Sequence, residues 1–456
     1  MGAMRPRLVS KGDFMIKSIT SVSALAACLV LSAQAQKPAA AAAHHTSDVT
    51  VVSPESVGFS SQRLERLHAL MQDATDKKEI AGAVTLLARH GKVVDYRVYG
   101  KRDLASGAAM TKDTIFRDYS MTKPVTGVAM MILFEEGKWL PNDPIAKYIP
   151  EFAHLKVYAG QNDDGSMKLV DPVHPPTMRE LMSHTAGFTY GFFGNTPVDK
   201  MVREANVFAQ PNLQGLIDKL ATIPLLYQPG EGWTYSLSMD IEGYIVEKLS
   251  GQSLPDFMRD HIFMPLGMKD AGFYVPAEKR SRFATNYWWD PKSNMVSAQP
   301  QGFVSPHEYG EQPTEASGGG GLVSTIEDYY RFAQMMGNGG ELNGKRIVSP
   351  ATVKLMTSNH VPEPLLTKGF GIGSQQIRPG FGYGYNCAVE FNPQEANLPD
   401  GKGTFLWDGA AGTWFWVDPT NDVVFVGMIQ RMGGGNPNLQ YLSRSIVYGA
   451  LVDPAK

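Results

Sequence analysis

Strand and helix patterns stand at both ends of this chain, and its middle differs from them. Apolar residues recur at helical spacing from Arg63 to Lys77, and strand patterns follow at about 81–89 and 93–99 around a turn at 90–92. Near the other end, strand patterns lie at 403–407, 412–418 and 422–431, and a helical pattern follows them. The sequence therefore predicts an α+β fold: an antiparallel sheet built from both termini and flanked by helices, with a mainly α-helical insertion.

The middle of the chain holds helical patterns separated by long loops rich in Pro, Gly and Asn. Capping boxes at Thr177–Glu180 and Ser324–Glu327 predict two helix starts. The glycine runs 318–321 and 433–435 are interpreted as turns, because neither continues as a phosphate-binding loop. We expect a sheet-plus-helix domain over 51–118 and 319–456. A mainly helical domain is expected over 119–318, with the active site at the interface.

Composition excludes several classes of protein. Hydrophobic residues make up 43% of the 456 and charged residues 19%, so the chain has enough apolar surface for a packed core. Lys plus Arg number 42 against 45 Asp plus Glu, and a net charge of −3 gives no electrostatic footprint for nucleic acid. The two cysteines, Cys28 and Cys387, exclude a disulfide scaffold and a cysteine-rich metal site.

The first fifty residues have the pattern of a targeting segment. Residues 1–14 precede Met15, an apolar run spans Val22 to Leu31, and Ala33-Gln34-Ala35 fits a signal-peptidase site. We therefore expect a signal peptide over 1–35 with an upstream extension at 1–14, a linker over 36–50, and a periplasmic or secreted protein. Lipid anchoring at Cys28 ranks second, because apolar residues follow that cysteine. No other run is long enough to predict a membrane span.

The most informative segment is an apolar helical pattern over about 120–136. It places Ser120 at the helix N-terminus and Lys123 three residues later on the same face, with Pro124 in the first turn. A serine hydroxyl needs a neighbour to take its proton, and an amine in an apolar pocket loses affinity for its own proton and can do so. The spacing S-x-x-K alone is weak, but the apolar flank makes a freely solvated lysine improbable.

The tetrad Ser120-Met121-Thr122-Lys123, on an apolar helix behind two strands, resembles the serine β-lactamase and penicillin-binding protein superfamily. The resemblance is closest to class C β-lactamases and family VIII carboxylesterases. Four other stretches agree with it: Thr177–Gly187, Pro229–Ser250, Ser317–Asp328 and Trp407–Pro419. The similarity covers about residues 50–452 and implies a β-lactamase/DD-peptidase-like fold.

The resemblance implies a second catalytic element at Tyr235. This phenol would share the proton traffic with Lys123, and the sequence leaves open which of the two is the general base. Leu237 stands where many β-lactamases keep an asparagine that binds the substrate's amide. Because leucine cannot donate or accept a hydrogen bond, this difference weakens the lactamase and peptidase interpretations.

The third implied element is Trp407-Asp408-Gly409, in the place of a K-T-G motif. Trp407 is uncharged where a basic residue usually meets a substrate carboxylate, and W-x-G resembles the esterase branch. Gly409 is expected to leave room for substrate, and the backbone N–H groups of Ser120 and Ala410 would form the oxyanion hole. Trp233 and Trp407 are expected to line an apolar acyl pocket.

Other chemistries have little support. The chain has no G-x-S-x-G motif, and His184 is interpreted as structural. No histidine spacing suggests zinc, and we expect no metal and no cofactor.

The favoured hypothesis is a serine hydrolase that cleaves small to medium acyl esters through an acyl-serine intermediate, with some β-lactam hydrolysis left open. One alternative is a β-lactamase or D-alanyl-D-alanine carboxypeptidase. Another is a non-catalytic acyl- or penicillin-binding module, and an acyltransferase is a further variant. The partner expected is a small-molecule acyl ester. Its identity, its stereochemistry and the oligomeric state stay open.

Overall fold

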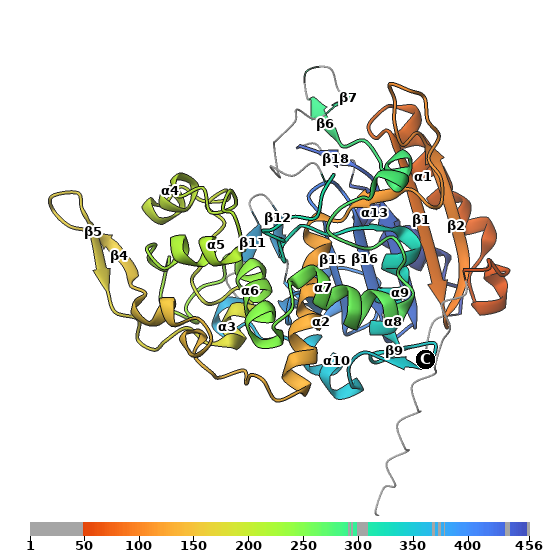
Figure 1. The fold of residues 1–456 in the computed structure, drawn as a ribbon. Coiled ribbons are helices and arrows are strands. Elements are labelled where there is room, and N and C mark those ends of the chain that lie inside the picture. Colours follow the sequence, from red (N-terminus) through yellow and green to blue (C-terminus); the bar gives the residue numbers. More distant parts are fainter. Residues whose placement is uncertain are drawn as a thin grey trace, which may run out of the picture. The chain divides into compact units, whose positions relative to one another are not determined.

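The computed structural model describes residues 49–290, 292, 295–298, 309–366, 370–372, 375–377, 379–433 and 438–453. These residues all belong to one compact unit (Figure 1). The predicted signal peptide at 1–35 and most of the predicted linker lie outside the described residues. Within the described part of the chain, no helix has the length and apolar character needed to cross a membrane. The expected domain boundaries near 119 and 318 stay a prediction.

The core is a seven-stranded antiparallel sheet in the order β13-β14-β15-β16-β17-β1-β2. Its strands are β1 (Gly82–Arg89), β2 (Lys92–Gly100), β13 (Phe381–Tyr383), β14 (Ala388–Glu390), β15 (Thr404–Asp408), β16 (Trp414–Asp418) and β17 (Val423–Met428). β1 and β17 pair directly, with Val84 opposite Met428 and Arg89 opposite Val423. The predicted antiparallel sheet built from both termini is therefore confirmed.

The turn between β1 and β2 explains why these strands form a hairpin. His90 and Gly91 have φ angles of 52° and 67°. Two successive positive φ angles define a turn whose twist matches that of paired strands. The His90 backbone N–H also donates to the carbonyl of Asp422 at 3.1 Å, which ties this turn to the end of β16–β17.

Helices cover both faces of the sheet. They are α1 (Ser61–Asp76) packed on α13 (Leu439–Ala450), and α9 (Ile326–Gly337). Neighbouring side chains of β16 point to opposite faces of the sheet, so one contacts each helical layer. Phe415 contacts Tyr329 of α9 with ring centroids 5.1 Å apart, whereas the Trp416 ring lies 5.9 Å from the guanidinium of Arg444 on α13.

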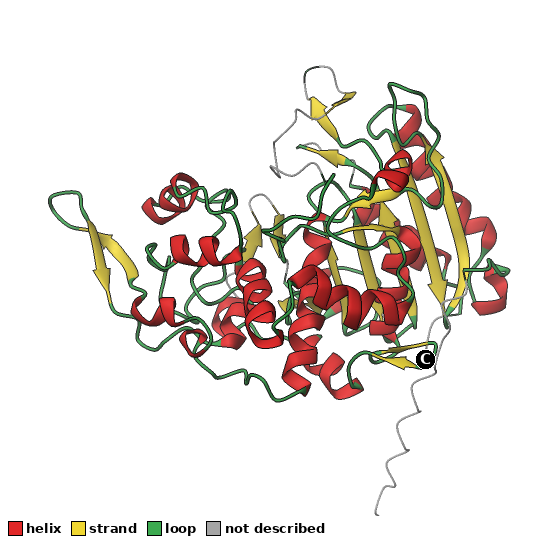
Figure 2. Cartoon of the chain, viewed as in Figure 1, coloured by secondary structure: helices red, strands yellow, loops and turns green. Residues whose placement is uncertain are grey.

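The remaining helices gather mainly in the predicted insertion (Figure 2). The α-helices are α2 (Thr122–Glu135), α3 (Met178–Met182), α4 (Pro197–Glu204), α5 (Leu213–Leu220), α6 (Ser238–Ser250), α7 (Leu254–Met258), α8 (Met264–Leu266), α10 (Pro350–Met356), α11 (Glu363–Leu366) and α12 (Pro393–Ala396). Short 3₁₀ turns are η1 (Pro54–Val57), η2 (Tyr119–Met121), η3 (Ile145–Lys147), η4 (Pro150–His154) and η6 (Ala277–Arg282), and η5 (Arg259–Phe263) is a π turn.

Small sheets complete the fold. They pair β3 (Ile115–Arg117) with β8 (Val323–Thr325), β4 (Val157–Gln161) with β5 (Met167–Val170), β9 (Glu341–Leu342) with β10 (Lys345–Arg346), β11 (Phe370–Ile372) with β12 (Gln375–Ile377), and β6 (Tyr287–Asp290) with both β7 (Met295–Ala298) and β18 (Arg431–Met432). The β3–β8 pair matters for the site, because β3 leads into the turn that carries Ser120 and β8 follows the 317–321 turn that contacts Lys123.

Of the two predicted capping boxes, one is confirmed and one is displaced. Thr177 and Glu180 cap α3 reciprocally, as predicted. The prediction at Ser324 and Glu327 is wrong by one residue: Thr325 is the N-cap of α9 and accepts from the backbone N–H of Asp328. Ser324 belongs to β8, and its hydroxyl donates to Asp118 instead, at 2.9 Å.

Candidate active site

Ser120 lies in a tightly held turn at the start of a buried helix. It sits in η2, which runs directly into α2, so the predicted place at the helix N-terminus is confirmed. Tyr119 before it has a φ of 47°, a left-handed conformation that is costly for a bulky residue. The Asp118 carbonyl holds this turn, because it accepts from the Met121 backbone N–H and from the Thr413 hydroxyl, both at 3.1 Å.

Lys123 lies next to the serine hydroxyl and is cut off from solvent. Its side chain is buried, with 0% exposed. Nζ lies 3.1 Å from Ser120 Oγ and donates to the carbonyl of Gly319 at 2.6 Å. Burial disfavours the charged ammonium and lowers the pKa of Lys123 to about 7. A large fraction of this amine is therefore neutral at neutral pH and able to accept a proton.

Tyr235 completes the cluster from the loop before α6. Its ring centroid lies 4.6 Å from Lys123 Nζ, and the indole N–H of Trp407 donates to its hydroxyl at 3.4 Å. Burial raises the pKa of Tyr235, and side-chain hydrogen bonds with Ser120 and Trp407 oppose that shift. The structure thus brings together the hydroxyl, amine and phenol that the sequence singled out; their catalytic roles stay predictions.

Aromatic side chains enclose the phenol. His184 packs edge-on against Tyr235 at 4.9 Å, and Trp233 stacks on it at 6.3 Å. His184 Nδ1 accepts from the backbone N–H of Ser236 at 3.3 Å, and burial lowers the pKa of this imidazole well below its usual range. A neutral histidine that faces the ring rather than Ser120 matches the structural interpretation of His184.

The two tryptophans pack around the Tyr235 phenol, and their expected place in an acyl pocket stays a prediction. Trp233 and Trp407 are both buried and contact the Tyr235 ring. Their packing fixes the phenol, so they form little open pocket surface. Leu237 precedes the first residue of α6 and is 0% exposed. Its expected place at the substrate stays a prediction.

Gly409 packs so closely against the turn before Ser120 that no side chain fits there. An ideal Cβ at this position would lie 2.3 Å from the Asp118 carbonyl oxygen and 2.2 Å from Thr413 Oγ1. The missing side chain therefore makes room for the turn that carries Ser120, and the expected room for substrate stays a prediction. Ala410 follows in the exposed turn that Gly409 and Gly412 close at 2.8 Å. The oxyanion role of the Ser120 and Ala410 amides stays a prediction.

Asp408 is the last residue of β15, directly after Trp407. Burial raises the pKa of this carboxyl to about 6, and the Lys123 charge opposes the shift. Asp408 therefore carries a negative charge at neutral pH. The K-T-G motif of the family has an uncharged threonine at this position, after its lysine.

Sequence reasoning missed the residues that hold Lys123. Asp240 on α6 accepts from the Ser317 hydroxyl at 2.5 Å and from the Gly319 backbone N–H at 3.2 Å, while the Gly319 carbonyl accepts from Lys123. An ideal Cβ at Gly319 would lie 2.6 Å from the Tyr190 hydroxyl. The glycine run 318–321 forms a turn, as predicted. Its contact with the Lys123 amine was not predicted. The only sequence feature that could have indicated this role is the position of the glycine run directly before a strand.

A second buried carboxyl lies near the amine. Glu242 on α6 accepts from the Asn386 side-chain amide at 2.6 Å, and burial raises the pKa of Glu242 to about 8. Among the residues that the structure describes, no group of three or more His, Cys, Asp or Glu side chains is arranged to hold a metal ion.

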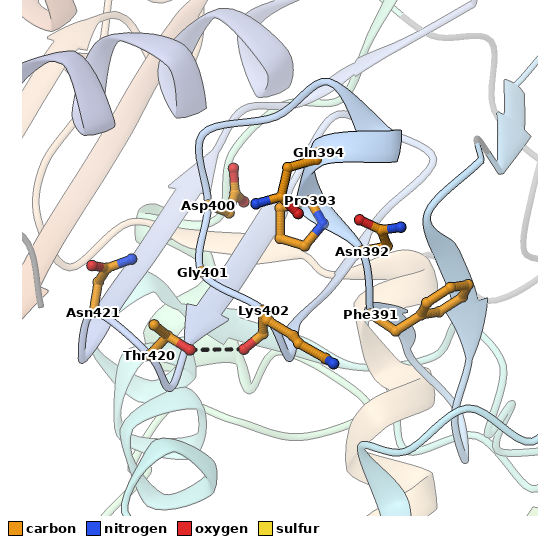
Figure 3. Close-up of a pocket in the computed structure, with 9 residues that line it drawn as sticks. All are labelled: Phe391, Asn392, Pro393, Gln394, Asp400, Gly401, Lys402, Thr420 and Asn421. Carbon is orange, nitrogen blue, oxygen red and sulfur yellow. Dashed lines mark hydrogen bonds between the residues drawn. The ribbon is translucent and has the colours of Figure 1, made fainter. Parts of the chain in front are cut away.

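A separate hollow lies at the β14–β15 end of the sheet (Figure 3). It is lined by Phe391, Asn392, Pro393, Gln394, Asp400, Gly401, Lys402, Thr420 and Asn421. None of the predicted site residues lines it. The chemistry argued from Ser120 therefore does not extend to this hollow.

The sheet with its helical layers and the Ser–Lys–Tyr cluster define a serine hydrolase of the β-lactamase fold. The family model Beta-lactamase matches residues 67–446, and the chain belongs to this family.

Relatives agree over most of the chain. It is 34% identical over 399 residues to Protein Rv1367c of Mycobacterium tuberculosis, which is 83% of this chain and 95% of that protein. It is 30% identical over 389 residues to Esterase EstB of Burkholderia gladioli, covering 81% and 92%. A solved structure titled "EstCE1, a hydrolase with promiscuous acyltransferase activity" matches with a TM-score of 0.71 and 28% identity, covering 85% of this chain and 99% of that one.

Proposed function

We propose that this protein is a serine carboxylesterase that cleaves small to medium acyl esters through an acyl-serine intermediate. The observation that carries the proposal is the buried amine of Lys123, whose Nζ lies 3.1 Å from Ser120 Oγ. Its lowered pKa leaves it free to accept the hydroxyl proton as Ser120 attacks the ester carbonyl. A neutral Tyr235 phenol beside both groups can pass a proton to the departing alcohol.

The second half of the reaction reverses these roles. Water attacks the acyl-serine carbonyl carbon, its proton passes to the amine–phenol pair, and the bond to Ser120 Oγ breaks as the oxygen regains a proton. The products are the carboxylic acid and the free enzyme. Since the acid and base are the same buried pair in both steps, no further group is required.

Three observations favour esters over β-lactams and D-alanyl peptides. Leu237 and Trp407 provide neither the amide nor the cation that those substrates engage. Asp408 places a carboxyl beside them, and like charges repel a substrate carboxylate. The likeness to a protein named as an esterase points the same way.

A substrate panel tests the proposal. The purified protein should hydrolyse p-nitrophenyl acetate and butyrate faster than nitrocefin, and Ser120→Ala should lose at least about 10³-fold of that rate. Ser106→Ala, at an exposed loop serine, is the matched control. Full activity in Ser120→Ala would end the proposal, and nitrocefin turnover above every ester would favour a β-lactamase. Absence of a covalent adduct with a fluorophosphonate would favour a binding module.

We also propose that the chain is exported with removal of residues 1–35. The support is the apolar run followed by Ala33-Gln34-Ala35. N-terminal sequencing of protein recovered from the periplasm or medium should begin at Gln36. Recovery of cytosolic protein that still carries Met15 would contradict export.

A further inference from the structure

Two phenyl rings lie open to solvent beside the catalytic cluster. Phe192 is 62% exposed and Phe193 is 49% exposed. Among the residues whose burial is described, no other Phe, Tyr or Trp is exposed to this degree. Burying a phenyl ring is one of the larger gains available to a folding chain, so neighbouring exposed rings indicate a surface that something else covers.

Phe192 belongs to a stack with Tyr190 and Phe208, and the Phe193 ring stands edge-on to Phe192 with an interplanar angle of 84°. The Tyr190 and Phe192 centroids are 6.1 Å apart with an interplanar angle of 14°, and those of Phe192 and Phe208 are 5.9 Å apart at 25°. Such near-parallel, offset rings have the geometry that aromatic groups prefer when they associate. Phe192 thus presents an open ring edge and face to anything flat that approaches.

The stack begins at the reacting groups. The Tyr190 ring lies 5.3 Å from the Tyr235 ring and 5.3 Å from Lys123 Nζ. Phe193 reaches the Tyr235 ring as well, at 5.9 Å. The exposed rings are therefore joined to the Ser120 cluster through direct contacts with Tyr235, which places them next to the groups that would hold the ester.

The loop that carries the rings is fixed by polar contacts with α4. The Thr189 hydroxyl donates to Asp199 at 2.7 Å and accepts from the Gly191 backbone N–H at 3.0 Å. Arg203 donates to the carbonyl of Gly194 at 3.1 Å. Since the loop is held in place before a ligand arrives, little conformational entropy remains to be lost on binding.

We infer that Phe192, Phe193 and the stack beneath them bind an aryl group of the substrate, so that the enzyme prefers aryl-bearing esters. This inference rests on the proposed function. The ring can come from the acyl side or from the alcohol side of the ester, and the shared chemistry is a flat, uncharged ring attached near the ester bond.

Turnover of matched esters tests the inference. Ethyl 3-phenylpropanoate against ethyl acetate probes the acyl side, and benzyl acetate against methyl acetate probes the alcohol side. In F192A/F193A the aryl-over-alkyl ratio of kcat/KM should fall about tenfold on one side, beyond any loss of turnover that the aryl and alkyl esters share. Met264→Ala, at a side chain 69% exposed on α8, is the matched control and should keep the ratio. An unchanged ratio on both sides, or an equal fall in Met264→Ala, overturns the inference.

Binding without turnover separates the two proposals. In the Ser120→Ala background, calorimetric titration with benzyl acetate and with ethyl 3-phenylpropanoate should show about tenfold weaker binding of at least one ligand after Phe192 and Phe193 are replaced by alanine. If the wild type hydrolyses no ester but this loss is seen, the esterase proposal fails and the aryl site stands. If small esters are hydrolysed but neither ligand binds Ser120→Ala, the aryl site fails and the esterase stands.

Discussion

Lys123 and Tyr235 are shifted in opposite directions by one physical cause. Burial penalises whichever form is charged, so it lowers the pKa of the amine to about 7 and raises the pKa of the phenol. In the proposed mechanism the amine would therefore accept the proton at neutral pH and the phenol would donate one. The sequence leaves open whether Lys123 or Tyr235 is the general base, and the pH dependence of the reaction can distinguish the two.

We expect the acid side of the kcat/KM profile to fall with a midpoint near pH 7. Below that value Lys123 is protonated and cannot accept the Ser120 proton, and above it the amine is neutral. A pH series with p-nitrophenyl acetate, corrected for spontaneous hydrolysis, measures the midpoint. A rate that stays constant from pH 5 to 9 would contradict Lys123 as the base.

Gly409 gives a second prediction for a single residue. A methyl group there would collide with the Asp118 carbonyl and with Thr413, so Gly409→Ala should displace the Ser120 turn and destabilise the fold by about 1–3 kcal/mol. Gly449→Ala on α13 has nothing within 4 Å of its new Cβ and should stabilise by about 0.5–1 kcal/mol. Thermal unfolding and ester turnover of both variants measure the contrast; equal behaviour would contradict the packing argument.

At the scale of elements, α6 and the 317–321 turn act together on the amine. Asp240 of α6 fixes the Gly319 peptide, and that peptide fixes Lys123. Asp240 is therefore a positioning residue, which acts through hydrogen bonds and through its charge. The negative charge of Asp240 also raises the pKa of Lys123, against the larger effect of burial.

Two substitutions at Asp240 separate these effects. Asp240→Asn keeps an acceptor for Ser317 and Gly319 but removes the charge, so the acid midpoint should move below pH 7 with kcat largely kept. Asp240→Ala removes the acceptor and should lower kcat by about 10²-fold through misplacement of the amine. Asp163→Asn, at an exposed loop, is the control. An unmoved pH midpoint in Asp240→Asn would contradict the charge argument.

Elements with strong local patterns could be predicted from the sequence. The helix expected over about 120–136 is η2 with α2, and the strands expected at 81–89 and 93–99 are β1 and β2, because hydrophobic periodicity and turn residues are local properties. The start of α9 was displaced by one residue, since Ser324 is drawn into a strand and a contact with Asp118 that lies far away along the chain.

The cluster around Ser120 could be predicted only in part, for the same reason. Ser120, Lys123 and Tyr235 carry recognisable spacing and motifs. Tyr190, Asp240 and Gly319 are ordinary residues until the fold brings them to the amine. The motif at Gly409 predicted a glycine there, but the contact of this position with the Asp118 carbonyl and Thr413 depends on chain segments far away in the sequence.

At the scale of the whole molecule, the buried lysine lowers stability. The pKa of Lys123 is 10.5 in an unfolded chain and about 7 in the fold, so the unfolded state binds more protons between those values. The free energy of unfolding therefore rises with pH from about 7 to 10.5, and the destabilisation is complete below pH 7. The burial that lowers the pKa of Lys123 therefore also lowers the free energy of unfolding.

Lys123→Met should therefore stabilise the protein while abolishing turnover. The gain is at most about 5 kcal/mol at pH 6 and should shrink as pH rises toward 10. Denaturant unfolding at pH 6, 8 and 9.5 measures it, with Lys138→Met at an exposed position as the control. A gain that grows with pH would contradict the assigned shift.

The pairing of β1 with β17 has a consequence for synthesis. His90 and Asp422, which join the two hairpins at this edge, are 332 residues apart. A ribosome needs roughly half a minute to make that stretch, and during this time β1, whose eight residues are all buried in the finished sheet, has no partner on one side. The apolar residues of β1 therefore stay without their β17 neighbour until the segment around Val423–Met428 has been made, and the native sheet closes only at the end of synthesis.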